Sequence, residues 1–242
     1  EEAISHYKMA IKIKPDYALP HNNLGNALVA ERKIEEAISH YKMAIGLKPD
    51  FAEAHYNLGN ALLNKGRTSE AISHYKMAIK LNPDFALAHN NLGNALLAIR
   101  ETEEAISYYR MAIELKPDYA PAHNNLGDAL SAERKTEEAI SHYKIAIKLK
   151  PDYAPTYNNL GGALLDERQT EKAISNFKMA IKLDPDLALA HYNLGNVLLE
   201  KERISEAVTH YKTAIKLKPD STEARHNLKI ALLRLEKKNV GR

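Results

Sequence analysis

Histidine is the residue type in this chain that most readily suggests chemistry, because imidazole binds zinc and titrates near neutral pH. The chain has eleven histidines. Ten of them form two repeating sets, namely His21, His55, His89, His123 and His191, and His6, His40, His74, His142 and His210. Each member of the second set follows a glutamate by four residues, the spacing of an ordinary pair on a helix surface. Copies in adjacent repeats lie too far apart to share a zinc ion at about 2 Å. We therefore expect structural histidines, with no metal and no cofactor.

Asparagine also recurs with a fixed spacing, in two sets that we call the first and second ladders. The first ladder is Asn23, Asn57, Asn91, Asn125, Asn159, Asn193 and Asn227. The second ladder is Asn26, Asn60, Asn94, Asp128 and Asn196, with Gly162 in the place of one member. Because Asn is a poor helix former, its recurrence on predicted helices indicates a role other than helix stability. A carboxamide donates and accepts hydrogen bonds, which suits the backbone of an extended peptide. Bonds between neighbouring helices are the alternative role.

Motifs for catalysis are absent from the sequence. It has no phosphate-binding loop, nucleophile elbow, His-Glu-x-x-His or calcium loop. Cysteine is absent too, which excludes disulfides, thiolate zinc sites and cysteine nucleophiles. Charge is nearly balanced, with 34 Lys plus Arg against 31 Asp plus Glu, so we expect neither a nucleic-acid nor a membrane partner. We predict that the chain is not an enzyme. Its compartment stays open, with the cytoplasm favoured.

A strict internal repeat must position these side chains. Proline recurs at positions 15, 49, 83, 117, 151, 185 and 219, always 34 residues apart. A period of this length is typical of a solenoid, in which each unit buries its apolar face against its neighbours. Within 18–51, apolar residues fall at i, i+3 and i+4 in both halves, which predicts two amphipathic helices per unit. Pro49 ends the second helix, and we expect Asp50 to N-cap the next one.

The repeat resembles a known family. The pattern His21-x-x-Leu24-Gly25-x-x-Leu28, followed by Ala37, Tyr41, Ala44 and Pro49, is similar to the tetratricopeptide repeat (TPR), and the similarity covers the whole chain. It implies an all-α, right-handed superhelical solenoid of helix-turn-helix repeats with a concave binding surface. One departure concerns the turn inside each repeat, where the usual Gly survives only as Gly66. If that turn is left-handed, each of Arg32, Arg100, Arg134 and Arg168 costs about 1 kcal/mol there.

The repeat also fixes the predicted organisation, a single array over 1–242. Residues 1–17 are the second helix of a truncated repeat, and 222–242 are a capping helix and tail. Six full repeats lie between them, at 18–51, 52–85, 86–119, 120–153, 154–187 and 188–221. Since 1–14 exposes an apolar stripe and 222–237 is a helix of the kind that would cover it, we expect weak head-to-tail self-association.

The predicted function is a scaffold that binds an extended polypeptide in the Asn-lined groove. The peptide-binding candidates are Asn23, Asn26, Asn57, Asn60, Asn91, Asn94, Asn125, Asp128, Asn159, Asn193 and Asn196, with Tyr56 and Tyr192 as anchors. The ladder resembles that of O-linked N-acetylglucosamine transferases, in whose repeat domain such residues hold the substrate backbone. A substrate-recruiting module of a larger enzyme, such as a protein O-glycosyltransferase, is therefore one alternative, and a structural spacer without ligand is another. A clamp for C-terminal carboxylates is disfavoured, because the inner positions carry Asn, Leu, Pro and Tyr instead of Lys and Arg.

Overall fold

The computed structural model describes residues 2–240, which form fourteen α-helices and no strand. They fall into two compact units that meet between Asn125 and Leu126. The first unit contains α1 (Glu2–Ile13), α2 (Ala18–Ala30), α3 (Ile34–Leu47), α4 (Ala52–Asn64), α5 (Thr68–Leu81), α6 (Ala86–Ala98) and α7 (Thr102–Leu115). Helix α8 (Ala120–Ala132) crosses the division. The second unit continues with α9 (Thr136–Leu149), α10 (Ala154–Asp166), α11 (Thr170–Leu183), α12 (Ala188–Glu200), α13 (Ile204–Leu217) and α14 (Thr222–Val240).

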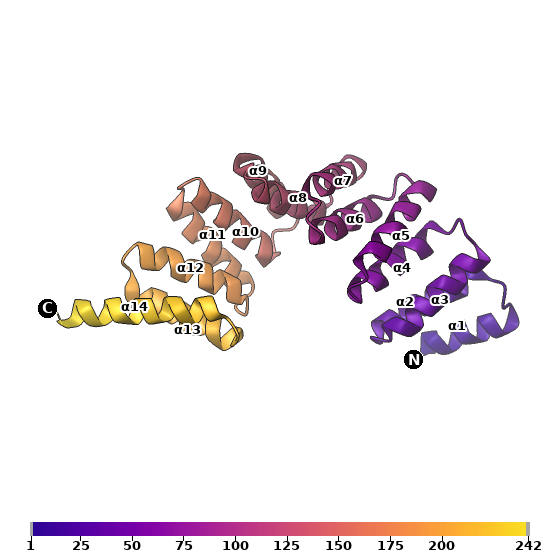
Figure 1. Cartoon of the computed structure of the whole chain (residues 1–242), viewed down its shortest axis with the longest axis horizontal. Coiled ribbons are helices and arrows are strands. Elements are labelled where there is room, and N and C mark those ends of the chain that lie inside the picture. The colour runs from indigo at the N-terminus through magenta and orange to yellow at the C-terminus, as the bar shows by residue number, and fades with distance from the viewer. Residues whose placement is uncertain (1, 241–242) are drawn as a thin grey trace. The chain divides into compact units, whose positions relative to one another are not determined.

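The predicted helix pairs are confirmed, and each full repeat starts where its first helix begins, from Ala18 to Ala188. We call the first helix of a repeat its A helix and the second its B helix. In each unit, helices lie side by side in chain order (Figure 1). The A helix packs on its own B helix, as in α2 on α3, and on the A helix of the next repeat, as in α2 on α4. The two units are therefore stacks of helix pairs. None of the described helices is long and apolar enough to cross a membrane.

The core of each repeat centres on one aromatic ring of the B helix, and this ring explains a glycine in the middle of each A helix. Tyr109 is fully buried. A Cβ built on Gly93 would lie 2.6 Å from Tyr109 Cε1, and the same clash occurs between Gly25 and Tyr41. Real Cβ atoms do not approach this closely, so the ring occupies the space that any side chain would need. The close approach offsets the roughly 1 kcal/mol that Gly costs in a helix interior.

The turn inside each repeat is left-handed. Gly66 has φ of 73°, and Arg32, Arg100, Arg134, Arg168 and Glu202 have φ between 56° and 67°. The backbone N–H of Glu101 donates to the carbonyl of Leu96, and that of Arg100 to Leu97, both at 3.0 Å. This is the bonding of a Schellman helix end, in which glycine is the favoured residue. The sequence had indicated four of these non-glycine turns, and Glu202 is the fifth.

The predicted aspartate N-caps are wrong. Helices α4 and α6 begin after Phe51 and Phe85, and neither helix has a side-chain cap. The aspartate lies one residue too early, in the turn, and an aromatic residue takes the capping position of both helices. Lys48 Nζ lies 5.2 Å from the centre of the Phe51 ring. At α14, by contrast, Ser221 Oγ accepts from the backbone N–H of Ala224 at 3.3 Å.

Helix α1 has no buried residue, and Met9 and Ile13 are 56% and 77% exposed. In α14, Lys229 stands at the position of the close-packing glycine, and Leu232 is exposed. Contact between these two helices in different copies of the chain stays a prediction.

Substitution of Gly93 tests the ring contact. Gly93→Ala should lower the free energy of unfolding by about 2 kcal/mol, because Tyr109 is fully buried and cannot move without repacking. Gly46→Ala is the matched control, since a Cβ there meets nothing within 4 Å. It should stabilise by about 0.5–1 kcal/mol. Urea denaturation followed by circular dichroism measures both, and an equal effect of the two changes would contradict the contact.

Arg100→Gly tests the turn. Since Arg100 has φ of 67°, the change should raise the free energy of unfolding by about 1 kcal/mol through relief of backbone strain. Arg134→Gly should behave alike. Lower denaturation midpoints for both variants would show that the arginine side chains stabilise the turn by more than their backbone strain costs.

Candidate functional site

The second ladder lies on the A helices, where each member accepts a hydrogen bond from the hydroxyl of the core tyrosine of its own repeat. Tyr41 Oη donates to Asn26 Oδ1 at 2.7 Å, and Tyr75 and Tyr109 bond Asn60 and Asn94 in the same way at 2.8 Å. Tyr143 donates to Asp128 and Tyr211 to Asn196. Burial raises the pKa of Tyr41 to about 12, so its hydroxyl stays protonated. The Oδ1 atoms of the second ladder are thereby used inside the protein.

From Asn57 onward, the first ladder joins each repeat to the one before it, whereas Asn23 accepts from its neighbour Asn22 at 3.5 Å. Asn91 Nδ2 donates to Asn60 Oδ1 at 2.9 Å and to Tyr56 Oη at 3.1 Å. Asn125 donates to Asn94 and Asn90, both at 3.0 Å. Corresponding bonds from the first ladder run from Asn57 to Asn22, Asn159 to Asp128, Asn193 to Asn158 and Asn227 to Asn196. The Nδ2 donors of the first ladder therefore serve the bonds between helices that the sequence had left as the alternative role.

Asp128 indicates how the side-chain amides of the second ladder are oriented. A carboxylate only accepts hydrogen bonds, yet Asp128 Oδ1 holds both bonds of this position, from Tyr143 at 2.7 Å and from Asn159 at 2.8 Å. The asparagines at the other positions must accordingly turn Oδ1 toward the tyrosine. Their Nδ2 groups point away from these bonds. In Asn26, Asn60, Asn94 and Asn196 the Nδ2 group forms no hydrogen bond with the described residues.

Both predicted anchors, Tyr56 and Tyr192, are half-buried and take part in the contacts between repeats. Tyr56 accepts from Asn91, and Tyr192 accepts from Asn227 at 3.4 Å. The Tyr56 ring also packs against Phe85, with centroids 4.8 Å apart. Tyr192 lines a cavity of about 280 Å³ with Leu189 and Lys218. Two leucines of the same helix differ in exposure, with Leu189 52% exposed and Leu199 9%.

Sequence reasoning missed a third set of asparagines. Asn22, Asn90 and Asn158 are at most 5% exposed and accept the bonds from the first ladder. They occupy the repeat position that Tyr56 and Tyr192 hold elsewhere. Asn124 holds the same position in a further repeat and is also buried. The restriction of this position to Asn or Tyr, two residue types that both accept hydrogen bonds, was the available signal.

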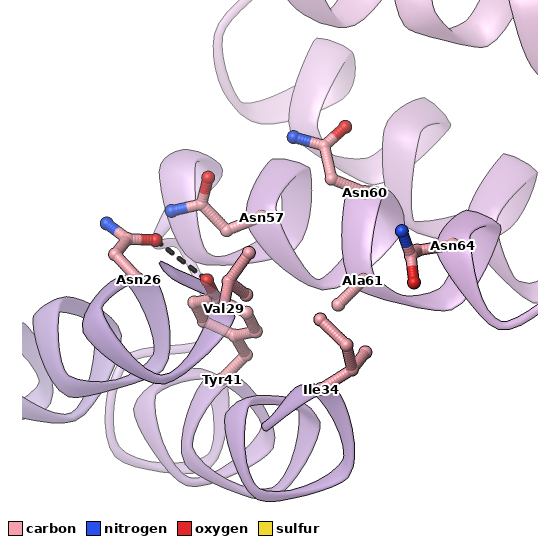
Figure 2. A pocket seen from close by; sticks show the side chains of 8 residues that line it. All are labelled: Asn26, Val29, Ile34, Tyr41, Asn57, Asn60, Ala61 and Asn64. Atoms are coloured by element: carbon pink, nitrogen blue, oxygen red, sulfur yellow. Dashed lines mark hydrogen bonds between the residues drawn. The ribbon is translucent and has the colours of Figure 1, made fainter. Parts of the chain in front are cut away.

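A pocket of about 290 Å³ opens between the first two full repeats. Val29, Ile34 and Ala61 form its apolar part, and Asn26, Asn57, Asn60 and Asn64 surround it. Figure 2 shows the carboxamides of Asn26 and Asn57 near each other, with the Tyr41 hydroxyl bonded to Asn26. All eight lining residues are uncharged. The pocket therefore suits an aliphatic side chain flanked by amide groups, and does not suit a carboxylate.

One repeat lacks the tyrosine–asparagine bond. Gly162 stands in the second ladder, and Phe177 replaces the tyrosine of the B helix. Donor and acceptor are therefore absent together, which avoids burying a hydroxyl without a partner. A Cβ built on Gly162 meets nothing within 4 Å.

The two histidine sets meet within the repeats. Nδ1 atoms lie 3.2 Å apart in His21 and His40, and 3.0 Å apart in His55 with His74 and in His191 with His210. His55 Nε2 donates to the Pro49 carbonyl at 3.2 Å, so its Nδ1 accepts and His74 Nδ1 donates. The expectation of ordinary surface pairs was therefore incomplete, because the partner across the repeat is another imidazole. The described residues contain no group of three potential ligands for a metal ion.

A double-mutant cycle at Gly162 and Phe177 tests the tyrosine–asparagine bond. Phe177→Tyr alone should destabilise by about 1–3 kcal/mol, because its buried hydroxyl finds no acceptor. Combined with Gly162→Asn, it gains that acceptor, so we expect a favourable coupling of about 1–2 kcal/mol in urea denaturation. Additive effects of the two changes would contradict the role given to this bond.

The histidine pairs should make stability depend on pH. Burial lowers the pKa of His40, His55, His74 and His210 below the ordinary value near 6.5. The unfolded chain then binds more protons than the folded one below that pH. The free energy of unfolding should be highest above pH 6.5 and fall as the pH decreases toward 5.

A repeat that has tyrosine in place of one histidine of the pair provides the control for this pH dependence. In one repeat, Tyr108 stands opposite His89, with ring centroids 5.9 Å apart. Changing His40, His74 and His210 to Tyr reproduces that arrangement and should flatten the fall in thermal midpoint between pH 7.5 and 5. An unchanged slope would assign the pH dependence to other groups.

Comparison with protein families gives one consistent result. A model described as TPR repeat matches residues 1–31, 25–66, 59–99, 135–167 and 163–202. Two further models are described as tetratricopeptide repeat. One matches residues 86–119 and 188–221, and the other matches residues 108–141. Among curated proteins, the search gave no significant match.

Solved structures share the fold. The Cut9–Hcn1 hetero-tetramer of APC/C matches 96% of this chain with TM-score 0.85 and 22% identity, and this chain spans 46% of that one. PilF of Pseudomonas aeruginosa matches 85% with TM-score 0.76 and 20% identity, over 94% of its own length. YrrB, described as a TPR protein with an unusual peptide-binding site, matches 76% with TM-score 0.63 and 27% identity, over 95% of its length. The repeat pattern, the helix pairs and these matches together show that the chain belongs to the tetratricopeptide repeat family.

Proposed function

We propose that this chain is a non-catalytic scaffold that holds an extended polypeptide along the Asn-bearing faces of its A helices. The observation that carries the proposal is the row of Nδ2 donors at Asn26, Asn60 and Asn94, which the protein's own bonds leave unused and aim away from the core. Peptide carbonyls are the natural acceptors for such a row. YrrB, whose description names a peptide-binding site, supports the same class of partner.

Affinity must come from the pocket as well as the ladder. Each net hydrogen bond contributes about 0.5–1.5 kcal/mol, while fixing one peptide residue costs about 1–2 kcal/mol in backbone entropy. The donors alone cannot hold a flexible peptide. An aliphatic side chain buried against Val29, Ile34 and Ala61 adds about 1.5–3 kcal/mol. We expect a dissociation constant no better than about micromolar, near −8 kcal/mol.

The two alternatives to a non-catalytic scaffold are distinguished by different measurements. A recruiting module of a larger enzyme would bind peptides in the same way as a scaffold, so only the activity of the parent protein distinguishes the two. A structural spacer would bind no peptide. The unused donors and the uncharged pocket favour binding over the spacer.

The test changes the second ladder without breaking its internal bonds. Asp128 accepts both bonds of this position, so Asn→Asp at Asn26, Asn60 and Asn94 keeps Oδ1 and replaces the outward donor with a negatively charged acceptor. We expect the triple variant to fold with the stability of the parent protein. A peptide selected on the parent from a displayed random library should bind it at least tenfold more weakly in calorimetry.

Asn82→Asp provides the matched control, because Asp184 occupies the equivalent position of another repeat, away from the ladders. It should leave affinity unchanged. Equal affinity of the triple variant and the parent would remove the ladder from the site, and a library that yields no binder would favour the spacer.

A further inference from the structure

The last residue of each repeat, directly before the next helix, is aromatic or leucine, except in the last full repeat. The position holds Tyr17, Phe51, Phe85, Tyr119, Tyr153 and Leu187, and then Ser221. Ser221 Oγ caps α14 by accepting from the backbone N–H of Ala224 at 3.3 Å, which explains the choice of serine. A serine is too short to fill the place that a ring takes elsewhere. The last full repeat therefore lacks the large side chain of its equivalents.

In the first full repeat, this ring has a defined environment. Phe51 packs against a cluster that includes Ala18 and Ala44, and Lys48 Nζ lies 5.2 Å from the centre of the ring. The same lysine contact recurs at three other rings of this position, with 5.0–5.5 Å between Nζ and the ring centre. Two alanines on one side and an ammonium group on the other thus define a place for an aromatic ring.

The second full repeat adds a stacking partner to this environment. The Tyr56 ring lies between two others, with centroids 4.8 Å from Phe85 and 6.1 Å from Tyr75. Tyr192 is the equivalent of Tyr56, and its ring meets Tyr211 with nearly the same geometry, 6.3 Å and 51° against 6.1 Å and 50°. Tyr192 is therefore held as Tyr56 is, without a ring in the place of Phe85.

In the last full repeat, these surroundings border a cavity of about 280 Å³, which we call the aromatic subsite. Ala188 and Ala214 line it at the positions of the two alanines beside Phe51, and Lys218 lines it at the position of Lys48. Tyr192, Leu189, Ser221 and Glu223 complete the lining. Because Lys218 and Glu223 carry opposite charges, the cavity has no net charge and favours a neutral occupant.

We propose that the aromatic subsite binds a phenylalanine or tyrosine side chain of the bound polypeptide, in the place that the protein's own ring holds in other repeats. The ligand ring stacks on Tyr192 and lies beneath Lys218. A leucine would fill the same space, but it would form neither the stacking nor the cation–π contact. The inference rests on the proposed function and adds the class of one ligand side chain to it.

Two small probes with the same backbone test the side-chain preference. N-acetylphenylalanine amide and N-acetylleucine amide are titrated into the full chain, and the ¹³C-labelled methyl groups of Ala188 and Ala214 are followed by NMR. An aromatic ring seated against these methyl groups shifts their signals through its ring current. We expect saturable shifts with the phenylalanine probe and a dissociation constant at least threefold lower than that of the leucine probe. Absence of a saturable shift, or equal constants, would overturn the proposal.

Substitution of Ser221 provides the matched pair of variants. Ser221→Phe supplies the protein's own ring and should raise the probe's dissociation constant at least tenfold. This variant should fold, because α4 and α6 each follow a phenylalanine and have no side-chain cap. Ser221→Ala removes the same cap but leaves the cavity open, so the constant should stay within twofold of the parent value. Equal weakening by both changes would assign the effect to the lost cap and overturn the subsite.

The subsite and the proposed function fail separately. The residues that line the subsite lie between 188 and 223, so probe binding does not use Asn26, Asn60 or Asn94. Failure of the phenylalanine probe to bind would overturn the subsite alone. Unchanged peptide affinity in the Asp variants of the second ladder would overturn the ladder's role alone.

Discussion

The contact between a glycine of the A helix and an aromatic ring of the B helix is the constraint on which the rest of each repeat depends. It brings the two helices close enough to bury the ring completely, as with Gly93 and Tyr109. The ring's position in turn determines where its hydroxyl lies. Because a buried hydroxyl needs an acceptor, the next polar residue on the A helix must offer an oxygen. The Asn-bearing face thus follows from the packing of the core.

This dependence gives the asparagines two roles. The protein uses the Nδ2 groups of the first ladder and the Oδ1 groups of the second for its own stability, while the Nδ2 groups of the second ladder stay available. A ligand therefore meets donors that are already oriented by the bonds behind them. Less side-chain freedom is lost on binding when the donors are held in advance, which favours affinity.

Much of the fold could be predicted from the period alone. The helix pairs followed from apolar spacing and proline, and the position of the turn inside each repeat followed from the place of glycine, all of which act locally. The left-handed backbone of that turn had entered only as a condition. The site was predicted less completely. The positions of Asn26 and Asn60 were evident, but the direction of their hydrogen bonds depends on Tyr41 and Tyr75, fifteen residues further along the chain. For the same reason, the pairing of His55 with His74 was not visible, since both lie on faces that meet only after the helices pack. The aspartate caps failed because each helix starts one residue later than the aspartate requires, and the repeat period does not fix a helix start to a single residue.

The left-handed turns also give the array unequal links. In a linear stack, each repeat contributes its own folding free energy and an interface with its neighbours, so a local strain lowers the stability of one link without spreading. Gly66 relieves that strain in the repeat 52–85, whereas Arg or Glu retains it in the other five. With respect to its turn, this repeat is the strongest link of the chain. Opening fluctuations will then be concentrated in the other repeats, and α4 and α5 will be favoured as the place where helical pairing starts and from which it spreads.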